Sequence, residues 1–264
     1  MARSAEVTSS PRVYLISRPH LDIAAIDRFL AEESLDWRRS PGATASEELV
    51  EIGGRVCYMS FGSSQSPRNT SAYIENLLAM GHESVLEHAV WTFVIVGVSR
   101  AFSHQLVRHR VGFAFSQLSQ QYHDENHAKF VFPEELQNRP IAAEKWLHAV
   151  QEAKTAYEDI LEAIDADSAI HSDVAGKERR RAVRSAARSV LPNATETKIV
   201  VTANARALRH FLRIRGEIIG DLEMRRVSTL LLNLMMAEAP SMFGDFELSN
   251  LPDGTPIVRS RQPL

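Results

Sequence analysis

Two arginines that flank a histidine, followed by hydroxyl and amide side chains, are the residues of this sequence best suited to chemistry. They are Arg108-His109-Arg110 and the run Ser116-Gln117-Leu118-Ser119-Gln120-Gln121-Tyr122, and no Asp or Glu occurs between Glu87 and Asp124. Arginine offers planar, paired donors to phosphate, and Ser and Gln can satisfy the remaining acceptors. A solvated helix end, whose cations complement the helix dipole, would explain the arginines but not the acid-free run behind them. We therefore expect an anion site.

A second basic group lies in the second half of the chain. Arg180, Arg184 and Arg188 recur at every fourth residue, a spacing that places them on one helical face. A charge run of this kind is usually a solvated surface, which we expect for Arg180 and Arg181. Arg188 differs because it precedes Leu191-Pro192 at the predicted end of the helix, where an arginine is placed to reach a pocket.

A third group begins at Asn204, the predicted N-cap of a helix on which Arg206 and His210 lie one turn apart. Arg215 precedes Gly216, which would let a ligand approach the backbone. The spacing is equally compatible with a basic helix that pairs with the acids after it, which are Glu217, Asp221 and Glu223.

Other reactive side chains carry weaker signals. His82, Glu83 and His88 fit no zinc-ligand spacing such as HExxH, so we expect a turn with satisfied polar groups and no metal. The single cysteine, Cys57, excludes an intrachain disulfide and a CxxC site, and we expect it to be a small buried hydrophobe. The glycine patterns of Rossmann and P-loop nucleotide sites are absent from the sequence.

Composition limits the class of protein. The 264 residues are 44% hydrophobic and 24% charged, as in an ordinary globular chain, and the net charge of -3 argues against general binding of nucleic acid. Residues 1–12 lack the apolar core of a secretory signal, and the longest apolar run, 89–98, is too short to cross a membrane. We therefore expect a cytoplasmic protein without a membrane segment.

The elements that position these residues follow from hydrophobic periodicity. The pattern predicts strands at 12–17, 88–98 and 197–202, and helices at 23–33, 47–58, 70–80 (ended by Gly81), 99–110, 142–164, 177–190, 204–214 and 217–238. Arg108-His109-Arg110 would then occupy the last turn of a helix, before a loop or short strand at 111–122. We predict an α+β fold, a single mixed α/β domain over 1–264 with a central antiparallel sheet flanked by long helices, and peripheral tails at 1–11 and 252–264.

Together these motifs resemble those of the flavin-dependent thymidylate synthases. That family is marked by an Arg-His-Arg, a short spacer and a Ser-rich run that ends in Ser-x-Arg-Tyr, similar to residues 108–110 and 116–122 here. The resemblance spans roughly residues 50 to 250. It includes Arg55-Val56-Cys57-Tyr58, Gly81-His82-Glu83-Ser84, Glu87-His88, Ala187-Arg188-Ser189-Val190-Leu191-Pro192, Asn204-Ala205-Arg206 and Arg215.

The resemblance implies a reductive methylation of dUMP to dTMP. FAD would be the cofactor, reduced by NADPH, and methylenetetrahydrofolate would supply the carbon. No enzyme cysteine attacks the uracil in this family, which agrees with a Cys57 that has no nucleophile motif around it. The resemblance also implies a mixed α/β fold and a homotetramer whose active sites lie at subunit interfaces.

The same resemblance assigns residues to the two ligands. Arg215 would favour the ionised form of uracil N3 and so make the ring more nucleophilic, a task that suits a permanently charged guanidinium. Ser119 would bind the nucleotide without attacking it. The dUMP site would comprise Gln105, Arg108, Gln117, Ser119, Gln120, Gln121, Arg188 and Arg215. The FAD site would comprise His88, Val90, Arg108, His109, Arg110, Gln117, Asn204, Ala205, Arg206 and His210.

Three positions depart from the family pattern. The spacer between Arg110 and Ser116 is one residue longer than usual, and we expect Gly112 to absorb the insertion. Gln121 stands where the family commonly has Arg, and Ile219 stands where it has His. Loss of one charged hydrogen bond costs on the order of 1.5–3 kcal/mol, so we expect weaker binding and retained function.

Two other interpretations stay open at this point. The departures at Gln121 and Ile219, together with the basic face at 180–188, would also suit a nucleotide- or RNA-binding relative without turnover. A flavoprotein of other specificity that oxidises NADPH is the third interpretation, and its oxygen consumption would ignore dUMP.

Overall fold

The computed structural model describes residues 5–8, 10–66, 69–166 and 176–261. They divide into two compact units. Unit 1 comprises the described residues of 1–12, 95–108 and 116–199. Unit 2 comprises those of 13–94, 109–115 and 200–264.

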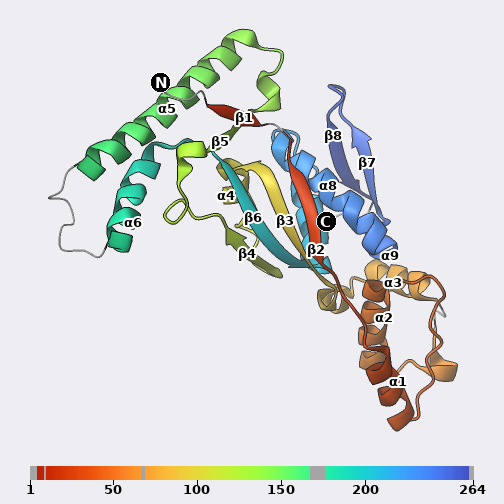
Figure 1. Cartoon of the computed structure of the whole chain (residues 1–264). Helices are drawn as coiled ribbons and strands as arrows, with labels where there is room; N and C mark the ends of the chain where they lie inside the picture. The colour runs from red at the N-terminus through yellow and green to blue at the C-terminus, as the bar shows by residue number, and fades with distance from the viewer. Residues whose placement is uncertain (1–4, 9, 67–68, 167–175, 262–264) are drawn as a thin grey trace. The chain divides into compact units, whose positions relative to one another are not determined.

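The main sheet has four strands, in the order β2 (Arg12–Ser17), β3 (Val90–Ser99), β6 (Glu196–Asn204) and β4 (Phe113–Gln117) (Figure 1). Strands β2, β3 and β6 are those that the alternating apolar residues predict. The Thr92 and Thr202 hydroxyls, 2.9 Å apart, hydrogen-bond between β3 and β6. The molecule combines this sheet with long helices and with an antiparallel hairpin near the C-terminus. The predicted α+β class is therefore confirmed.

Unit 1 places two helices beside each other, α5 (Pro140–Ala166) and α6 (Gly176–Ala187) (Figure 1). Buried Ala128, Phe130 and Val150 form a cluster against which Trp146 and Leu191 pack. The remaining elements of this unit are β1 (Glu6–Thr8), which pairs in parallel with β5 (Lys129–Val131), α4 (Arg100–Leu106), and the short 3-10 helices η3 (Glu125–His127), η4 (Glu134–Leu136) and η5 (Arg188–Val190).

Unit 2 is built around buried aromatic side chains, among them Trp91, Phe211, Phe243 and Phe246. Its helices are α1 (Ile23–Glu32), α2 (Ala45–Tyr58), α3 (Thr70–Ala79), α7 (Ala205–Arg215), α8 (Leu222–Glu238) and α9 (Pro240–Phe243), with the short 3-10 helices η1 (Gly62–Ser64) and η2 (Glu83–His88). An antiparallel hairpin is formed by β7 (Phe246–Asn250) and β8 (Pro256–Ser260). No helix among the described residues is long and apolar enough to cross a membrane.

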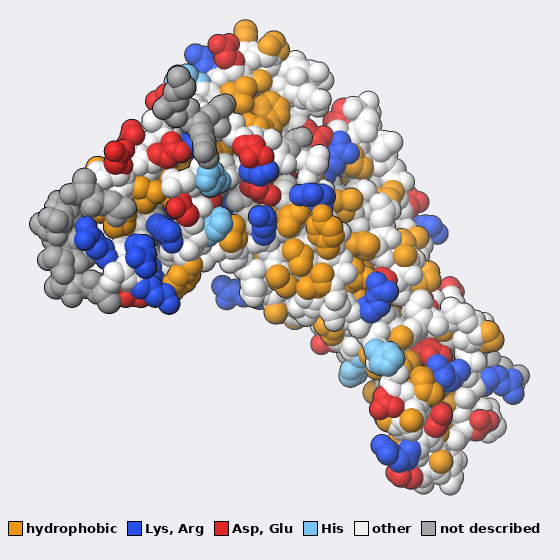
Figure 2. Space-filling model, in the orientation of Figure 1, with side chains coloured by type: hydrophobic (Ala, Val, Ile, Leu, Met, Phe, Trp, Pro, Cys, Tyr) orange, Lys and Arg blue, Asp and Glu red, His pale blue; other side chains and the backbone are white. Residues whose placement is uncertain are grey.

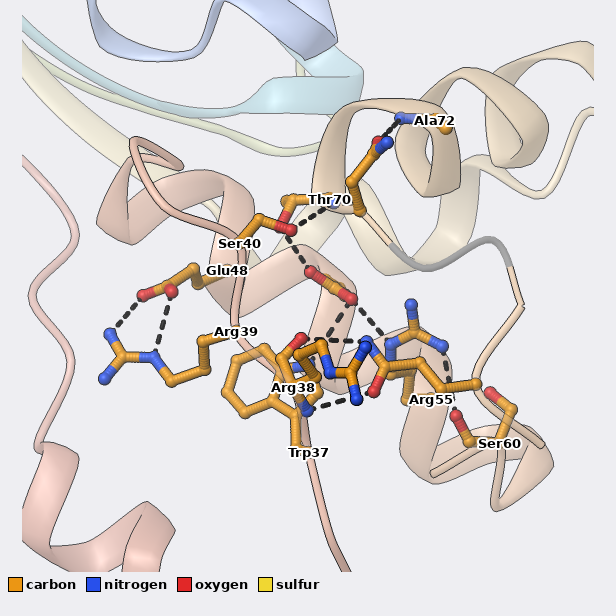
Figure 3. Close-up of polar contacts among 12 residues, drawn as sticks. Trp37, Arg38, Arg39, Ser40, Glu48, Arg55, Ser60, Thr70 and Ala72 are labelled. Carbon is orange, nitrogen blue, oxygen red and sulfur yellow. Dashed lines mark hydrogen bonds and ion pairs between the residues drawn. The ribbon is translucent and has the colours of Figure 1, made fainter. Parts of the chain in front are cut away.

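A buried ion pair joins α2 to α3 (Figure 3). Arg55 Nε donates to Glu51 Oε1 at 2.6 Å, and both side chains are fully buried. Thr70 Oγ1 donates to Glu51 Oε2 at 2.6 Å, and the Arg55 guanidinium lies 4.3 Å from the centroid of the Tyr73 ring. Because a buried charge is stable only with such partners, Arg55 serves to hold these two helices together.

Three predicted helix boundaries are wrong. The helix expected at 177–190 is α6, which ends at Ala187 and is followed by η5. The helix expected at 99–110 is α4, which ends at Leu106, so Arg108-His109-Arg110 lies in the turn and loop that lead to β4. The helix expected from residue 217 is α8, which starts at Leu222 because Asp221 caps it by accepting from Met224 N at 3.0 Å. The end of α3 is as predicted, with Gly81 at a φ of +71° just beyond it.

The expected tails also need correction. Residues 6–8 form β1, and residues 256–260 form β8, whose Ile257 and Val258 are buried. The C-terminal segment is therefore part of unit 2 and not peripheral over those residues; 1–4, 9 and 262–264 lie outside the described residues. Cys57, expected to be buried, is exposed in the last turn of α2.

Candidate active site

Gly112 holds the loop that carries His109 and Arg110 against the start of α7. Its carbonyl oxygen accepts from Asn204 N at 3.1 Å, and its φ is +72°. A Cβ at this position would lie 2.6 Å from Asn204 Nδ2, so only glycine fits. Asn204 in turn caps α7 as predicted, accepting from Ala207 N at 2.8 Å.

The His109 ring lies within an aromatic group in unit 2. Its centroid is 5.2 Å from that of Phe211, 6.0 Å from that of Phe113 and 6.2 Å from that of His210. Burial, and to a smaller degree the nearby charges of Arg215 and His210, lower the pKa of His109 to about 4. The imidazole is therefore neutral near pH 7.

Arg215 contacts this neutral ring directly. Its Nε donates to His109 Nε2 at 3.0 Å. An imidazole nitrogen accepts only when it carries no proton, so this contact places the His109 proton on Nδ1. The structure thus brings together two expected site residues that lie far apart in the sequence.

The arginines of α7 pair with the acids of η2. Arg206 Nη1 lies 2.7 Å from Glu87 Oε1, and Arg213 Nη1 lies 3.4 Å from Glu83 Oε1. The interpretation of residues 82–88 as a turn with satisfied polar groups is confirmed for these two acids. Arg206 and Arg213 thus pair with acids that precede the helix, whereas the buried Arg209 pairs with Asp245, which follows it.

A backbone bond fixes the remaining expected cofactor residues of unit 2. Ala205 N donates to Ala89 O at 2.9 Å, so His88 and Val90 flank the residue that bonds to the start of α7. The exposed His88 ring packs over Gly53, where an added Cβ would lie 3.1 Å from His88 Cδ2. We call the following residues the α7 cluster: His88, Val90, His109, Arg110, Asn204, Ala205, Arg206, His210 and Arg215.

Unit 1 holds the other expected residues, which we call the loop cluster: Gln105, Arg108, Gln117, Ser119, Gln120, Gln121 and Arg188. Ser119 organises its turn, because its carbonyl oxygen accepts from His123 N at 2.9 Å and its hydroxyl accepts from Gln121 N at 3.3 Å. Gln117 Nε2 donates to Ser103 Oγ at 2.9 Å and to Thr197 Oγ1 at 3.2 Å. Both N–H groups of the Gln117 amide are therefore used inside the protein.

Gln120 is the strongest sign of a ligand site in this cluster. The residue is 6% exposed, yet its Nε2 has no hydrogen-bond partner among the described residues. A buried donor without an acceptor is costly and rare in native proteins, so this amide is suited to an acceptor on a ligand. Arg100 contacts the same loop, since its Nη1 donates to the carbonyl oxygen of Leu118 at 3.5 Å. Burial lowers the pKa of Arg100; Glu125 opposes this shift and the charge of Arg188 adds to it.

Helix α6 makes contacts with the 121–122 loop that the sequence did not indicate. Arg181 Nε donates to Gln121 Oε1 at 3.3 Å, and Gln121 Nε2 donates to Ser185 Oγ at 3.4 Å. Arg184 Nη1 donates to the carbonyl oxygen of Tyr122 at 3.0 Å. Arg181, expected on a solvated surface, has a side chain that is 42% exposed and that also bonds to this loop. Figure 2 shows Lys and Arg side chains gathered over α6. The spacing of the arginines predicts that they share one face of this helix, but it does not predict which residues they contact.

Comparison with known proteins decides the family. A family model described as thymidylate synthase complementing protein matches residues 42–241. A flavin-dependent thymidylate synthase of Corynebacterium aurimucosum is 40% identical over 247 residues, which cover 93% of this chain and 98% of the relative. One from Mycobacteroides abscessus is 42% identical over 235 residues, covering 88% and 91%. The chain belongs to the flavin-dependent thymidylate synthase family.

The α7 cluster has the donor chemistry that the flavin of this family requires. A dinucleotide cofactor needs cations for its phosphates, and the cluster offers the exposed Arg110 and the half-exposed Arg206. Its ring system needs flat apolar surface and hydrogen-bond donors, and the cluster offers the imidazoles of His109 and His210. The residues present therefore fit FAD.

The structure shows the place of Ile219, the residue expected to depart from the pattern of the flavin-dependent thymidylate synthases. Its side chain is 70% exposed and carries no donor. Its carbonyl oxygen accepts from Nη2 of the buried Arg225 at 3.3 Å. The turn before α8 is thus held by its backbone. The Gly216 turn is also structural: Val258 N donates to its carbonyl oxygen at 3.1 Å, so β8 and not a ligand makes the close approach expected there.

Proposed function

We propose that this protein is an enzyme that converts dUMP to dTMP, with FAD as cofactor and with NADPH and methylenetetrahydrofolate as co-substrates. Its membership of the flavin-dependent thymidylate synthases over most of the chain supports this reaction. Apart from family membership, the observation that supports the proposal is the contact of Arg215 with the neutral ring of His109.

The loop cluster is proposed to bind dUMP. Arg108 and Arg188 would pair with its phosphate, and Ser119, Gln120 and Gln121 would supply neutral donors, with Gln105 and Gln117 completing the site. The Nε2 of Gln120 supports this assignment, since it is a buried donor without a partner among the described residues and is suited to a nucleotide oxygen. Gln117 would contribute its Oε1 acceptor, because its amide nitrogen is already engaged.

The α7 cluster is proposed to hold FAD, with Arg108 and Gln117 from unit 1 as further contacts. Bound FAD would supply the reducing equivalents that NADPH delivers. Arg110 and Arg206 would face its phosphates, and His88, His109 and His210 would lie against its ring system. Val90, Asn204 and Ala205 would contribute backbone and packing contacts.

Arg215 is proposed to act on the substrate. A guanidinium keeps its charge at any pH the protein survives, so it can stabilise the anion formed when uracil N3 loses its proton. The ring then becomes a better nucleophile without attack by a cysteine. The proposed role of His109 is to orient this guanidinium, because its neutral Nε2 accepts from Arg215 Nε.

The family resemblance further leads us to propose one catalytic domain over residues 1–264, in a cytoplasmic homotetramer whose active sites lie at subunit interfaces. Sedimentation velocity tests the assembly. A protein that sediments as a monomer at micromolar concentration would contradict the tetramer.

The reaction is tested by measuring dTMP made from dUMP by the purified protein with FAD, NADPH and methylenetetrahydrofolate under low oxygen. We expect multiple turnovers from the wild type. Arg215→Ala should abolish dTMP formation while the protein stays folded and retains flavin, and Arg259→Ala, in an exposed residue of β8, is the matched control. Unchanged turnover in Arg215→Ala would refute its role, and oxygen consumption that ignores dUMP would favour a flavoprotein of other specificity.

A further inference from the structure

The neutral side chain of Gln121 lies in the proposed nucleotide site and contacts a cation on α6. The flavin-dependent thymidylate synthases commonly carry an arginine here, whereas this chain has Gln121, which brings no charge to the proposed nucleotide site. The structure holds this amide from both ends. Gln121 Oε1 accepts from Arg181 Nε at 3.3 Å, and Gln121 Nε2 donates to Ser185 Oγ at 3.4 Å. A guanidinium on α6 therefore stands within hydrogen-bond distance of the neutral side chain.

Arg181 is fixed in this place by further contacts. Its guanidinium carbon lies 5.4 Å from the centroid of the Tyr122 ring, and its Nη1 lies 3.4 Å from Glu178 Oε2. The ion pair with Glu178 is weak, because the two side chains are 42% and 54% exposed and water screens them. Asp124 lies 3.9 Å from Arg184 of the same helix and is also about half exposed. Among the described residues, the acids near α6 therefore screen the charge of Arg181 only weakly.

Donors remain available on both side chains. Arg181 uses Nε and Nη1 in these contacts, and its Nη2 has no partner among the described residues. The Gln121 amide nitrogen carries two N–H groups, of which one donates to Ser185. An arginine that donates to the amide oxygen polarises the amide and strengthens its other N–H as a donor. The pair can thus present charged and neutral donors to the same anion.

We propose that Arg181 supplies, from α6 and through Gln121, the positive charge for the dUMP phosphate that position 121 lacks. Arg181 is in this sense a positioning and specificity-determining residue of the nucleotide site. The inference rests on the proposed function, since it concerns the phosphate of the proposed substrate. It predicts a preference for the phosphorylated nucleotide that depends on a residue outside the Ser-rich run.

The test compares the dissociation constants of dUMP and of deoxyuridine, which lacks the phosphate, in wild type and Arg181→Gln. We expect Arg181→Gln to weaken dUMP binding about tenfold, as loss of one charge-assisted hydrogen bond does, and to leave deoxyuridine binding unchanged. In turnover, KM for dUMP should rise while kcat holds. Arg180→Gln is the matched control, because Arg180 is the exposed neighbour on the same helix and should leave both constants unchanged.

A double variant distinguishes the loss of positive charge from a disturbance of the loop structure. Arg181→Gln combined with Gln121→Arg moves the cation back into the loop and should restore dUMP binding. If Arg181→Gln binds dUMP as the wild type does, weakens both ligands equally, or is not rescued by the double variant, the proposal is wrong. A wild type that neither binds nor converts dUMP would instead reject the proposed function, before Arg181 is considered.

Discussion

At the scale of single residues, the position of the Arg215 guanidinium depends on the protonation state of the His109 ring that it contacts. Burial, then Arg215 and His210, lower the pKa of His109 from 6.5 to about 4. Protonation would remove the Nε2 acceptor and place a second positive charge 3.0 Å from Arg215 Nε. The pair is therefore stable only while the ring is neutral, and acid should disturb the fold and Arg215 together.

This coupling predicts a pH dependence of stability. In the unfolded chain His109 binds a proton below about pH 6.5, whereas in the folded chain it does so only near pH 4, so protons favour the unfolded chain. The destabilisation should grow as the pH falls from 6.5 to about 4 and then stay constant. His109→Gln keeps an acceptor for Arg215 but cannot titrate. Urea unfolding across this range should show a shallower loss of stability in the variant, and parallel curves would contradict the assignment.

Single residues also show how far the sequence could be interpreted alone. The sequence pointed to Arg108, His109 and Arg215 because their types carry chemistry, but it could not pair His109 with Arg215, which lies 106 positions away. Arg181 was assigned to a solvated face because most charge runs are solvated. Cys57 was assigned to the core because cysteines usually are buried, yet it lies on the exposed side of α2.

At the scale of elements, Gly112 is the joint between the loop at 109–112 and the start of α7. Gly112→Ala places a Cβ 2.6 Å from Asn204 Nδ2 on a backbone with φ +72°. Gly254 is the matched control, since its φ is +82° and nothing lies within 4 Å of an added Cβ. Gly254→Ala should cost only the strain of a left-handed residue, about 1–2 kcal/mol. Gly112→Ala should cost more in urea unfolding and also lower the flavin content; equal costs would show that the contact with Asn204 does not matter.

Elements with a clear period were predictable, and those set by tertiary contacts were not. Strand β2 has the predicted bounds, and the cap at Asn204 was correctly placed, because alternation and capping are local signals. The early end of α4 and the late start of α8 depend on where the chain must turn. The three-residue strands β1 and β5 are too short for any periodicity, and the buried pair of Arg55 and Glu51 looks in sequence like an ordinary helix-surface pair.

At the scale of the whole molecule, the loop cluster lies in unit 1 and the α7 cluster lies in unit 2. Arg108 and Gln117 of unit 1 are expected to contact both dUMP and FAD. The residues expected at the dUMP site, except Arg215, lie in unit 1, and those of the α7 cluster lie in unit 2. The sequence predicted one domain because no linker or change of composition separates the units. The chain passes from one unit to the other within strands such as β3 and β6, which leave no boundary in the residue pattern.

The C-terminal hairpin is the part of the molecule where the expectation of a tail fails most clearly. Strand β8 pairs with β7 along its whole length, and its Ile257 and Val258 are buried. Arg225 of α8 is 3% exposed, and its Nη1 donates to Thr255 Oγ1 at 2.7 Å and to Pro256 O at 2.8 Å. These acceptors satisfy the buried charge of Arg225, so α8 depends on the segment at 255–256. The composition of that segment alone predicts a peripheral tail.

Ending the chain after Asn250 should therefore destabilise unit 2 severely. Arg225 would lose both acceptors, and removing the partners of a buried charge costs about 3–5 kcal/mol, a large fraction of the roughly 5–15 kcal/mol that stabilises a typical protein. Loss of the buried side chains of β8 adds to this cost. A chain ended after Arg261 keeps every contact named here and is the control. Urea unfolding followed by circular dichroism should show a much lower midpoint for the shorter chain, and the same midpoint for both would mean that β8 is peripheral after all.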